Sequence, residues 1–227
     1  MILEAKEIKG GYKKEVDILR GINLEVDNGE AVGIIGLNGS GKSTLGKALM
    51  NMLPFLRGDI VFDNKNISSM STSKIAQMGI SIMFQGGKVF DNLSISDNLM
   101  LAGKVDKELI DIIPLLQENN GNKMADHLSG GQRHQLALAM ALLSRPRLVI
   151  LDEPSAGLSP KAVDEMYQIL TAVKQHLGLS IILIEQNISK AISFCDRSLL
   201  ISQGQIEEVF LNKDIKEIEA IMFNNIE

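Results

Sequence analysis

The stretch that most constrains this chain is residues 36–44, which follow the apolar run Ala31–Ile35. It matches the pattern G-x-x-x-x-G-K-[ST], whose glycines let the backbone curl so that successive N–H groups point at one anion. Lys42 adds a positive charge, Ser43 offers a hydroxyl to Mg²⁺, and the helix that follows directs its positive end at the same anion. We expect a phosphate-binding loop for a nucleoside triphosphate, with a ligand-free glycine turn as the alternative. The predicted nucleotide-binding residues are Gly36, Leu37, Asn38, Gly39, Ser40, Gly41, Lys42, Ser43 and Thr44.

Length and composition fit a globular protein, because 227 residues with 45% hydrophobic side chains can bury a substantial core. The net charge of −5, without a long basic cluster, argues against nucleic acid as a partner. Cys195, the single cysteine, follows apolar residues and is expected to be a buried structural thiol. Charge interrupts the N-terminal apolar run too early for a signal peptide, and no run of about 18 apolar residues is present. We expect a chain that is neither exported nor inserted in a membrane.

The N-terminal part alternates apolar and polar side chains in residues 2–8 and 22–26, which predicts half-buried antiparallel strands. Tyr12 lies between them, where its ring either stacks on adenine or packs at a strand end. Residues 58–62 predict a strand, residues 63–66 a turn and residues 72–78 a short helix.

A strand predicted at residues 80–84 ends at Gln85, which two glycines follow. A neutral amide there can contact a metal ion or the attacking water, with a flexible hinge behind it. An ordinary polar loop residue is the alternative.

Residues 94–117 have a helical pattern interrupted at Gly103, and this predicts a small helical insertion with a partner surface. The sequence Leu-Ser-Gly-Gly-Gln follows at residues 128–132, before the helical stretch 135–143. Ser129 is a natural N-cap, and the glycines leave backbone amides open to an anion. A plain capped helix would not need the glycine pair. The predicted anion-contacting residues are Ser129, Gly130, Gly131 and Gln132.

The run 148–151 is apolar throughout, which predicts a parallel strand that is covered on both faces. It ends in Asp152 and Glu153, so we expect Asp152 to hold Mg²⁺ and Glu153 to polarise an attacking water. A solvated acidic strand end is the alternative. A second buried strand at residues 181–184 brings Gln186 to the same edge of the sheet.

The tail predicts a helix at residues 163–177, a strand pair at 199–201 and 205–209, and a terminal helix. The three histidines, His127, His134 and His176, lack the spacing of metal ligands, so surface or packing roles are expected.

In their order and spacing, these motifs resemble the ATPase subunit of ABC transporters over essentially the whole chain. The segments 153–160 and 184–187 are most similar to ATPases of branched-chain amino acid importers. The resemblance implies an α/β P-loop NTPase with a mostly parallel core sheet, an N-terminal antiparallel subdomain and an inserted helical subdomain. It implies one nucleotide-binding domain over 1–227, with the core at 1–85 and 146–227 and the helical subdomain at about 90–145.

The family further implies ATP and Mg²⁺ as cofactors and a head-to-tail dimer in which the signature at residues 129–132 contacts the partner's ATP. It implies permease subunits docked near Gln85 and the helical lobe, an extracytoplasmic solute-binding protein as a further partner, and a peripheral position on the cytoplasmic face of the membrane. Catalysis would fall to Glu153 and Gln186, and the metal to Ser43, Gln85 and Asp152.

Two positions depart from the family pattern. Ser159 stands where most relatives have an aspartate, and Gln186 where they have a switch histidine. A glutamine can donate a hydrogen bond but cannot carry a proton. We expect Gln186 to lower hydrolysis without abolishing it, and a different ATPase subunit to supply a histidine. A lipid or export ATPase, and a regulatory ATP-dependent clamp with weak hydrolysis, remain as alternatives.

Overall fold

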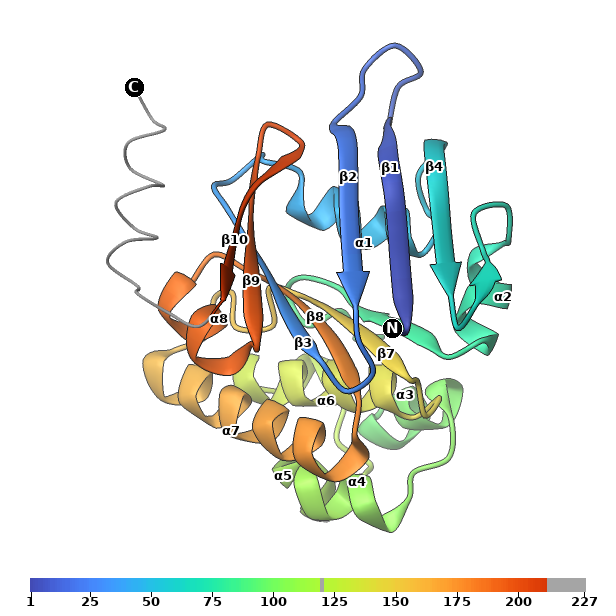
Figure 1. The fold of residues 1–227 in the computed structure, drawn as a ribbon. Helices are drawn as coiled ribbons and strands as arrows, with labels where there is room; N and C mark the ends of the chain where they lie inside the picture. The colour runs from blue at the N-terminus through green and yellow to red at the C-terminus, as the bar shows by residue number, and fades with distance from the viewer. Residues whose placement is uncertain (119–120, 212–227) are drawn as a thin grey trace.

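The computed structural model describes residues 1–118 and 121–211, which form two sheets with helices on either side of the larger one (Figure 1). The larger sheet has the order β10-β9-β3-β8-β7-β6. Its strands pair in parallel from β9 to β6, and β10 pairs antiparallel with β9. Its strands are β3 (Ala31–Ile35), β6 (Ile80–Met83), β7 (Leu148–Asp152), β8 (Ser180–Glu185), β9 (Arg197–Ser202) and β10 (Gln205–Leu211).

The second sheet is antiparallel and has the order β2-β1-β4-β5. It consists of β1 (Leu3–Gly11), β2 (Leu19–Val26), β4 (Phe55–Phe62) and β5 (Lys65–Asn66). The predicted antiparallel N-terminal strands are therefore confirmed. The turn expected over residues 63–66 is half as long, because Asp63 and Asn64 adopt positive φ and Lys65 already pairs with Phe62.

Helix α1 (Lys42–Leu49) lies between the two sheets, and its Leu45 packs in one core with Val32 and Ile34 of β3. The opposite face of the larger sheet is covered by α6 (Gly130–Leu142), α7 (Pro160–Leu177) and α8 (Ile188–Phe194). Successive strand residues point to opposite faces, so strands with apolar side chains on both faces form a central sheet that is buried on both sides. The predicted α/β class with a mostly parallel core is confirmed.

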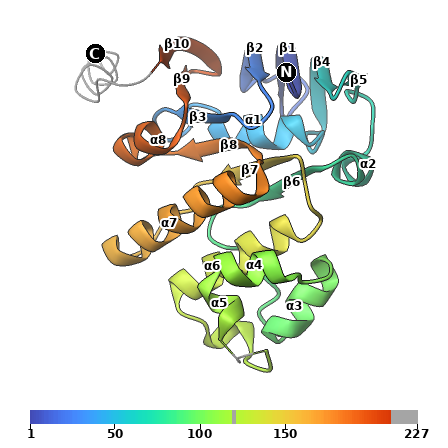
Figure 2. The ribbon, with the colours of Figure 1, turned by 60° about the horizontal axis from the view of Figure 1, so that its bottom comes forward.

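The insertion contains α3 (Ile95–Ala102), α4 (Lys107–Ile112), α5 (Pro114–Gln117) and a 3₁₀ turn, η1 (Ala125–His127). It gathers at the end of the molecule opposite the antiparallel sheet (Figure 2). The helical pattern of residues 94–117 is thus divided among three helices. The first helix ends at Gly103, where the chain passes so close to α6 that a Cβ would lie 3.1 Å from Leu143 O. The third helix begins at Pro114, a residue that suits the first turn of a helix. The subdomain limits at 85, 90 and 145 stay a prediction.

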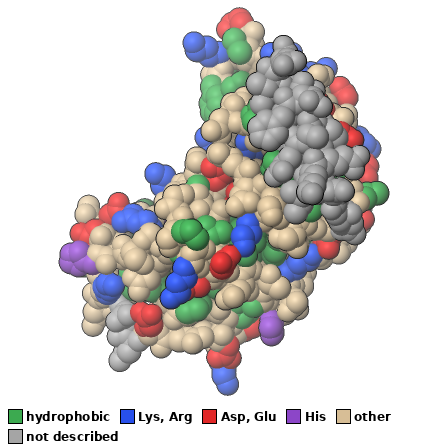
Figure 3. Space-filling view, turned by 90° about the vertical axis from the view of Figure 1, so that its left-hand side faces the viewer, with side chains coloured by type: hydrophobic (Ala, Val, Ile, Leu, Met, Phe, Trp, Pro, Cys, Tyr) green, Lys and Arg blue, Asp and Glu red, His purple; other side chains and the backbone are tan. Residues whose placement is uncertain are grey.

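The remaining helix, α2 (Thr72–Gln77), packs beside β6. Cys195 is 7% exposed, which agrees with the predicted buried thiol, and burial raises its pKa well above the ordinary range. The predicted terminal helix lies outside the described residues. Within residues 1–118 and 121–211, no helix combines the length and the apolar character that crossing a membrane requires. On the face drawn in Figure 3, basic and acidic side chains are interspersed.

Candidate nucleotide-binding site

The phosphate loop joins β3 to α1 with glycines in left-handed conformations, at φ 81° for Gly39 and φ 110° for Gly41. The ammonium group of Lys42 is folded back into the loop, where Nζ donates to Gly36 O at 2.8 Å and to Leu37 O at 2.9 Å. Burial lowers the pKa of Lys42, and the carboxylates of Glu153, Asp152 and Glu185 oppose this shift. Ser40 Oγ is buried and has no partner among the described residues. The loop therefore holds a cation and a hydroxyl that an anion can satisfy.

Ser43 and Asp152 meet although they are far apart in the sequence. Ser43 Oγ donates to Asp152 Oδ1 at 2.8 Å, because β7 ends beside the first turn of α1. Asp152 is 3% exposed, and burial raises its pKa, with the Ser43 hydrogen bond acting in the opposite direction. A hydroxyl beside one carboxylate suits Mg²⁺, which takes few protein ligands and completes its shell with phosphate and water. Among the described residues, no group of three or more His, Cys, Asp or Glu side chains forms a separate metal cage.

Glu153 is held between two glutamines. Gln85 Nε2 donates to its Oε2 at 2.5 Å, and Gln186 Nε2 donates to its Oε1 at 2.6 Å. Glu153 is 5% exposed and adopts φ 48°, a left-handed conformation that is uncommon for a non-glycine residue. The structure therefore brings together the three side chains that the sequence placed at three separate strand ends.

Glu185 is a site residue that our sequence analysis did not single out. It is 2% exposed and accepts hydrogen bonds from Ser155 Oγ at 2.5 Å and from the backbone N–H of Gln186 at 3.0 Å. It thereby fixes the turn from which Gln186 reaches Glu153. The signal was available, because Glu185 ends an apolar parallel strand as Asp152 does.

A cavity of about 430 Å³ lies in front of the phosphate loop. Its lining includes Ile18, which sequence reasoning missed because an apolar residue before a strand gives no signal of its own. Tyr12 does not line this cavity. Lys47 Nζ of α1 donates to the Tyr12 hydroxyl at 3.1 Å and lies 5.4 Å from the ring centre. The lining residues are Ile18, Asn38, Gly39, Gly41, Lys42, Ser43, Thr44, Gln85, Glu153 and Gln186.

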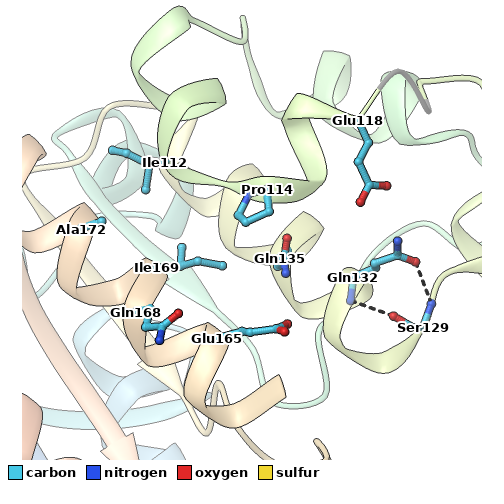
Figure 4. Close-up of a pocket in the computed structure, with 10 residues that line it drawn as sticks. All are labelled: Ile112, Pro114, Glu118, Ser129, Gln132, Gln135, Glu165, Gln168, Ile169 and Ala172. Carbon is cyan, nitrogen blue, oxygen red and sulfur yellow. Dashed lines mark hydrogen bonds between the residues drawn. The ribbon is translucent and has the colours of Figure 1, made fainter. Parts of the chain in front are cut away.

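The signature residues lie elsewhere, at the start of α6 beside a separate groove of about 700 Å³ between α5, α6 and α7 (Figure 4). Ser129 Oγ accepts from the backbone N–H of Gln132 at 3.2 Å, and Gln132 Oε1 accepts from the N–H of Ser129 at 3.2 Å. This capping box confirms the predicted N-cap. A Cβ on Gly130 or Gly131 would lie 3.6 Å from Leu158 and 3.4 Å from Ala162, respectively, so packing within the chain does not require glycine at either position.

A glycine-rich loop between a parallel strand and a helix, with buried carboxylates at a neighbouring strand end, defines a P-loop nucleoside triphosphatase. The ABC transporter family model matches residues 19–156. The chain therefore belongs to the ABC transporter family and is one of its ATP-binding and ATP-hydrolysing subunits.

Individual relatives support the same assignment. The high-affinity branched-chain amino acid transport ATP-binding protein BraG of Pseudomonas aeruginosa is 31% identical over 205 residues, which are 86% of this chain and 87% of BraG. The lipopolysaccharide export system ATP-binding protein LptB of Escherichia coli K12 is 30% identical over 217 residues, 90% of this chain and 88% of LptB. The structure of cbiO1 from Clostridium perfringens, described as part of the transporter complex cbiONQ, is 30% identical with a TM-score of 0.80, covering 96% of this chain and 90% of cbiO1. The predicted similarity to ATPases of branched-chain amino acid importers is confirmed by BraG.

Proposed function

We propose that this chain powers a membrane importer of branched-chain amino acids or a similar small solute, by binding and hydrolysing Mg²⁺-ATP. The observation on which this rests is Glu153, a buried carboxylate that lines the cavity of the phosphate loop. A carboxylate so placed can accept a proton from a water molecule at the end of the triphosphate.

Binding of the triphosphate falls to residues 36–44. The N–H groups of the loop and of the first turn of α1 face the phosphates, and Lys42 exchanges its hydrogen bonds to Gly36 O and Leu37 O for phosphate oxygens. Tyr12 contributes a ring for the adenine base, beside Lys47 on α1. The geometry of the loop supports the role of residues 36–44, and the position of Tyr12 ahead of the loop in the sequence supports its role.

Ser43 and Asp152 would hold the metal, and Gln85 would complete its protein contacts. Mg²⁺, when bound, would neutralise charge on the β- and γ-phosphates. The protein residues fit this group because Asp152, Glu153 and Glu185 are all buried near a single buried cation, Lys42, and this leaves an excess of negative charge.

Glu153 and Gln186 carry the catalytic step. Glu153 orients the attacking water and accepts its proton, and Gln186 donates a hydrogen bond to the γ-phosphate or to the same water. Gln85 and Gln186 each donate to one oxygen of this carboxylate, so redirecting the two amides would free lone pairs for the attacking water. Nucleotide binding is the event that redirects the two amides.

A second ATPase subunit completes the site. Its signature helix faces the ATP held by this chain, and the signature helix of this chain faces the ATP held by the second subunit. The capped start of α6 presents Ser129, bare glycine amides and a helix N-terminus, and none of these residues lines the chain's own phosphate cavity. Because Gln186 cannot carry a proton, a partner with a histidine at this position would make a heterodimer more active than a homodimer.

The permease docks in an apolar groove of about 360 Å³ between α2, β6, α3 and α6. Its lining includes Phe84, directly before Gln85, so a segment bound in the groove would lie close to a residue of the proposed catalytic site. Ser81 Oγ is buried in this part of the described structure without a hydrogen-bond partner, which leaves one donor for the docked segment. Docking would hold the chain at the cytoplasmic face of the membrane, and an importer of this kind would also use a solute-binding protein.

The substrate is the least constrained part of the proposal. BraG supports an amino acid, whereas LptB supports a lipid exporter as the alternative. Branched-chain amino acid import is favoured because the segments 153–160 and 184–187 also resemble that group. Uptake of labelled leucine in cells with and without the gene is the corresponding measurement, and unchanged uptake would favour the alternative.

A regulatory clamp with weak hydrolysis is a second candidate. It is favoured by the two amides that donate to both oxygens of Glu153, since these bonds leave fewer lone pairs for an attacking water. Tight ATP binding without release of phosphate by the chain assembled with its permease would support the clamp.

Glu153→Gln tests the proposed mechanism. We expect turnover of ATP to fall by roughly 10²- to 10⁴-fold, the usual contribution of a general base, while ATP affinity changes little. Steady-state release of phosphate and binding of a fluorescent ATP analogue measure the two quantities. Hydrolysis by the variant at the wild-type rate would contradict the assignment.

A further inference from the structure

The two glycines after Gln85 form a hinge that rests on the signature helix. Gly86 and Gly87 adopt φ 79° and 57°. A Cβ on Gly86 would meet nothing within 4 Å, but one on Gly87 would lie 3.1 Å from His134 Nδ1 and 3.2 Å from His134 Cα. The hinge is therefore free at its first residue and in close contact with α6 at its second.

His134 connects this contact to the signature turn. Its Nδ1 lies 2.9 Å from Gly130 O, and because a carbonyl oxygen only accepts, Nδ1 carries the proton. The residue is 4% exposed, and Nε2 is buried with no partner among residues 1–118 and 121–211. Nδ1 of the imidazole therefore has a hydrogen-bond partner, whereas Nε2 is an acceptor without one among the described residues.

An unpaired buried acceptor is unfavourable, and an apolar side chain would fill the same space without this penalty. A histidine at this position is understandable if Nε2 gains a donor in a second arrangement of the hinge. The hinge has a reason to move in the proposed function, because Gln85, the residue before it, would exchange its bond to Glu153 for a contact with Mg²⁺.

We propose that His134 is a positioning residue that transmits the state of Gln85 to the signature turn, through Gly87 on one side and Gly130 on the other. The proposal rests on the proposed function, in which Gln85 leaves Glu153 when Mg²⁺-ATP binds. Displacement of the hinge then moves the ring, Nε2 acquires a hydrogen-bond donor, and Gly130 is adjusted at the surface that receives the partner's ATP. The hinge is the element with two arrangements that such coupling needs.

His134→Ala tests the coupling against a matched control. His176 has the same local bond, with Nδ1 2.9 Å from Ala172 O one helical turn earlier, but it lies on the exposed side of α7. We expect His134→Ala to lower kcat by roughly 2- to 30-fold, the usual range for coupling residues, with ATP affinity unchanged, and His176→Ala to change neither. Equal kcat values for His134→Ala and wild type would overturn the proposal.

The state of Nε2 can be followed without removing the ring. The chain has three histidines, so ¹⁵N spectra of the imidazoles are simple to assign with the two alanine variants. In the wild-type protein, addition of Mg²⁺ and a non-hydrolysable ATP analogue should shift the Nε2 resonance of His134 from a bare to a hydrogen-bonded position, and leave that of His176 in place. An unchanged His134 resonance in nucleotide-saturated protein would refute the coupling even if His134→Ala fails to fold.

The two proposals fail in different ways. If Glu153→Gln hydrolyses ATP like wild type, the proposed catalytic mechanism is wrong. If Glu153→Gln is inactive while the His134 resonance and the kcat of His134→Ala are unaffected, the catalytic mechanism stands and the role of His134 is wrong.

Discussion

At the scale of single residues, the chemistry of this chain centres on Glu153 and on the neutral amide beside it. Gln186 Nε2 lies 2.6 Å from Glu153 Oε1, at the place where the family pattern has a histidine. An amide donates one kind of hydrogen bond at every pH, whereas an imidazole changes charge near pH 6.5. The choice of glutamine therefore removes a titrating group from the catalytic centre.

Gln186→His should restore that titration. We expect kcat at pH 8 to rise about tenfold, equivalent to ~1.4 kcal/mol of barrier, because a neutral imidazole can take up a proton and an amide cannot. Below about pH 6 the protonated ring pairs with Glu153, and the advantage over wild type shrinks. The ratio of variant to wild-type kcat between pH 6 and 8 is the measurement, and a ratio independent of pH would contradict this role.

At Asp152, the proposed role in holding the metal has a cost in stability. Burial raises its pKa, so the folded state favours the protonated form, and the ionised carboxylate present at neutral pH lowers the free energy of unfolding. Below the ordinary pKa of an aspartate, the carboxyl group is protonated and this contribution to the free energy of unfolding is complete. It is lost as the pH rises through the raised pKa of the folded state. Asp152→Asn should therefore raise Tm at pH 7.5 in the absence of Mg²⁺, by about 2–4 °C for each kcal/mol, and the gain should disappear near pH 4.

Asp196 is the matched control with the opposite sign. Burial pushes its pKa upward, but the N–H of Ala31 and the ammonium of Lys174 overcome this, and the pKa is lowered. Its stabilisation is present above the ordinary pKa and is lost as the pH falls, so Asp196→Asn should lower Tm at pH 7.5. Shifts in the same direction for both variants would contradict the electrostatic account.

At the scale of elements, α6 combines an ordinary helix start with an unusual pair of glycines. The capping box of Ser129 and Gln132 satisfies its first amides, as in many helices. The glycines lack such a local reason, since the chain leaves room for a methyl group at both positions. Their use is understood if the surface above them must admit a phosphate from outside the chain.

Gly131→Ala separates folding from function. Alanine favours the helix by up to about 1 kcal/mol relative to glycine, so the Tm should be unchanged or slightly higher. Turnover of ATP should nevertheless fall by about tenfold or more, because the crowded turn holds the partner's nucleotide less well. Thermal unfolding and phosphate release measure the two effects, and wild-type turnover would show that the glycines serve only the fold.

At the scale of the whole molecule, the nucleotide cavity and the signature turn belong to different surfaces. A nucleotide held between them needs two chains, each supplying one half. Closure is then a population shift, set by the extra contacts that ATP makes in the dimer.

Glu153→Gln with Mg²⁺-ATP should associate with a second copy or with another ATPase subunit, and with ADP it should remain a monomer. Light scattering after size exclusion measures the mass. The same protein carrying Gly131→Ala as well should require a higher concentration to associate. Association independent of nucleotide, or unaffected by Gly131→Ala, would contradict a dimer held together by ATP.

Much of the fold could be predicted from the sequence because its signals are local. Residues 36–44 dictate their own curled backbone, the apolar runs before Asp152 and Glu185 specify buried parallel strands, and Ser129 caps its own helix. The interruption at Gly103 was indicated by the sequence, but the further division at Pro114 was less clear, because the apolar helical pattern of residues 109–116 continues across it.

What the sequence determined by itself is the class of ligand and the edge of the sheet at which it binds, since loop, strand end and cap are encoded by neighbouring residues. Only the tertiary structure decided that Gln85 and Gln186 both hold Glu153, that Glu185 fixes the turn behind them, and that Gly87 rests on His134. These contacts join residues from different strands and helices, and their geometry depends on how the parallel sheet and α6 pack together.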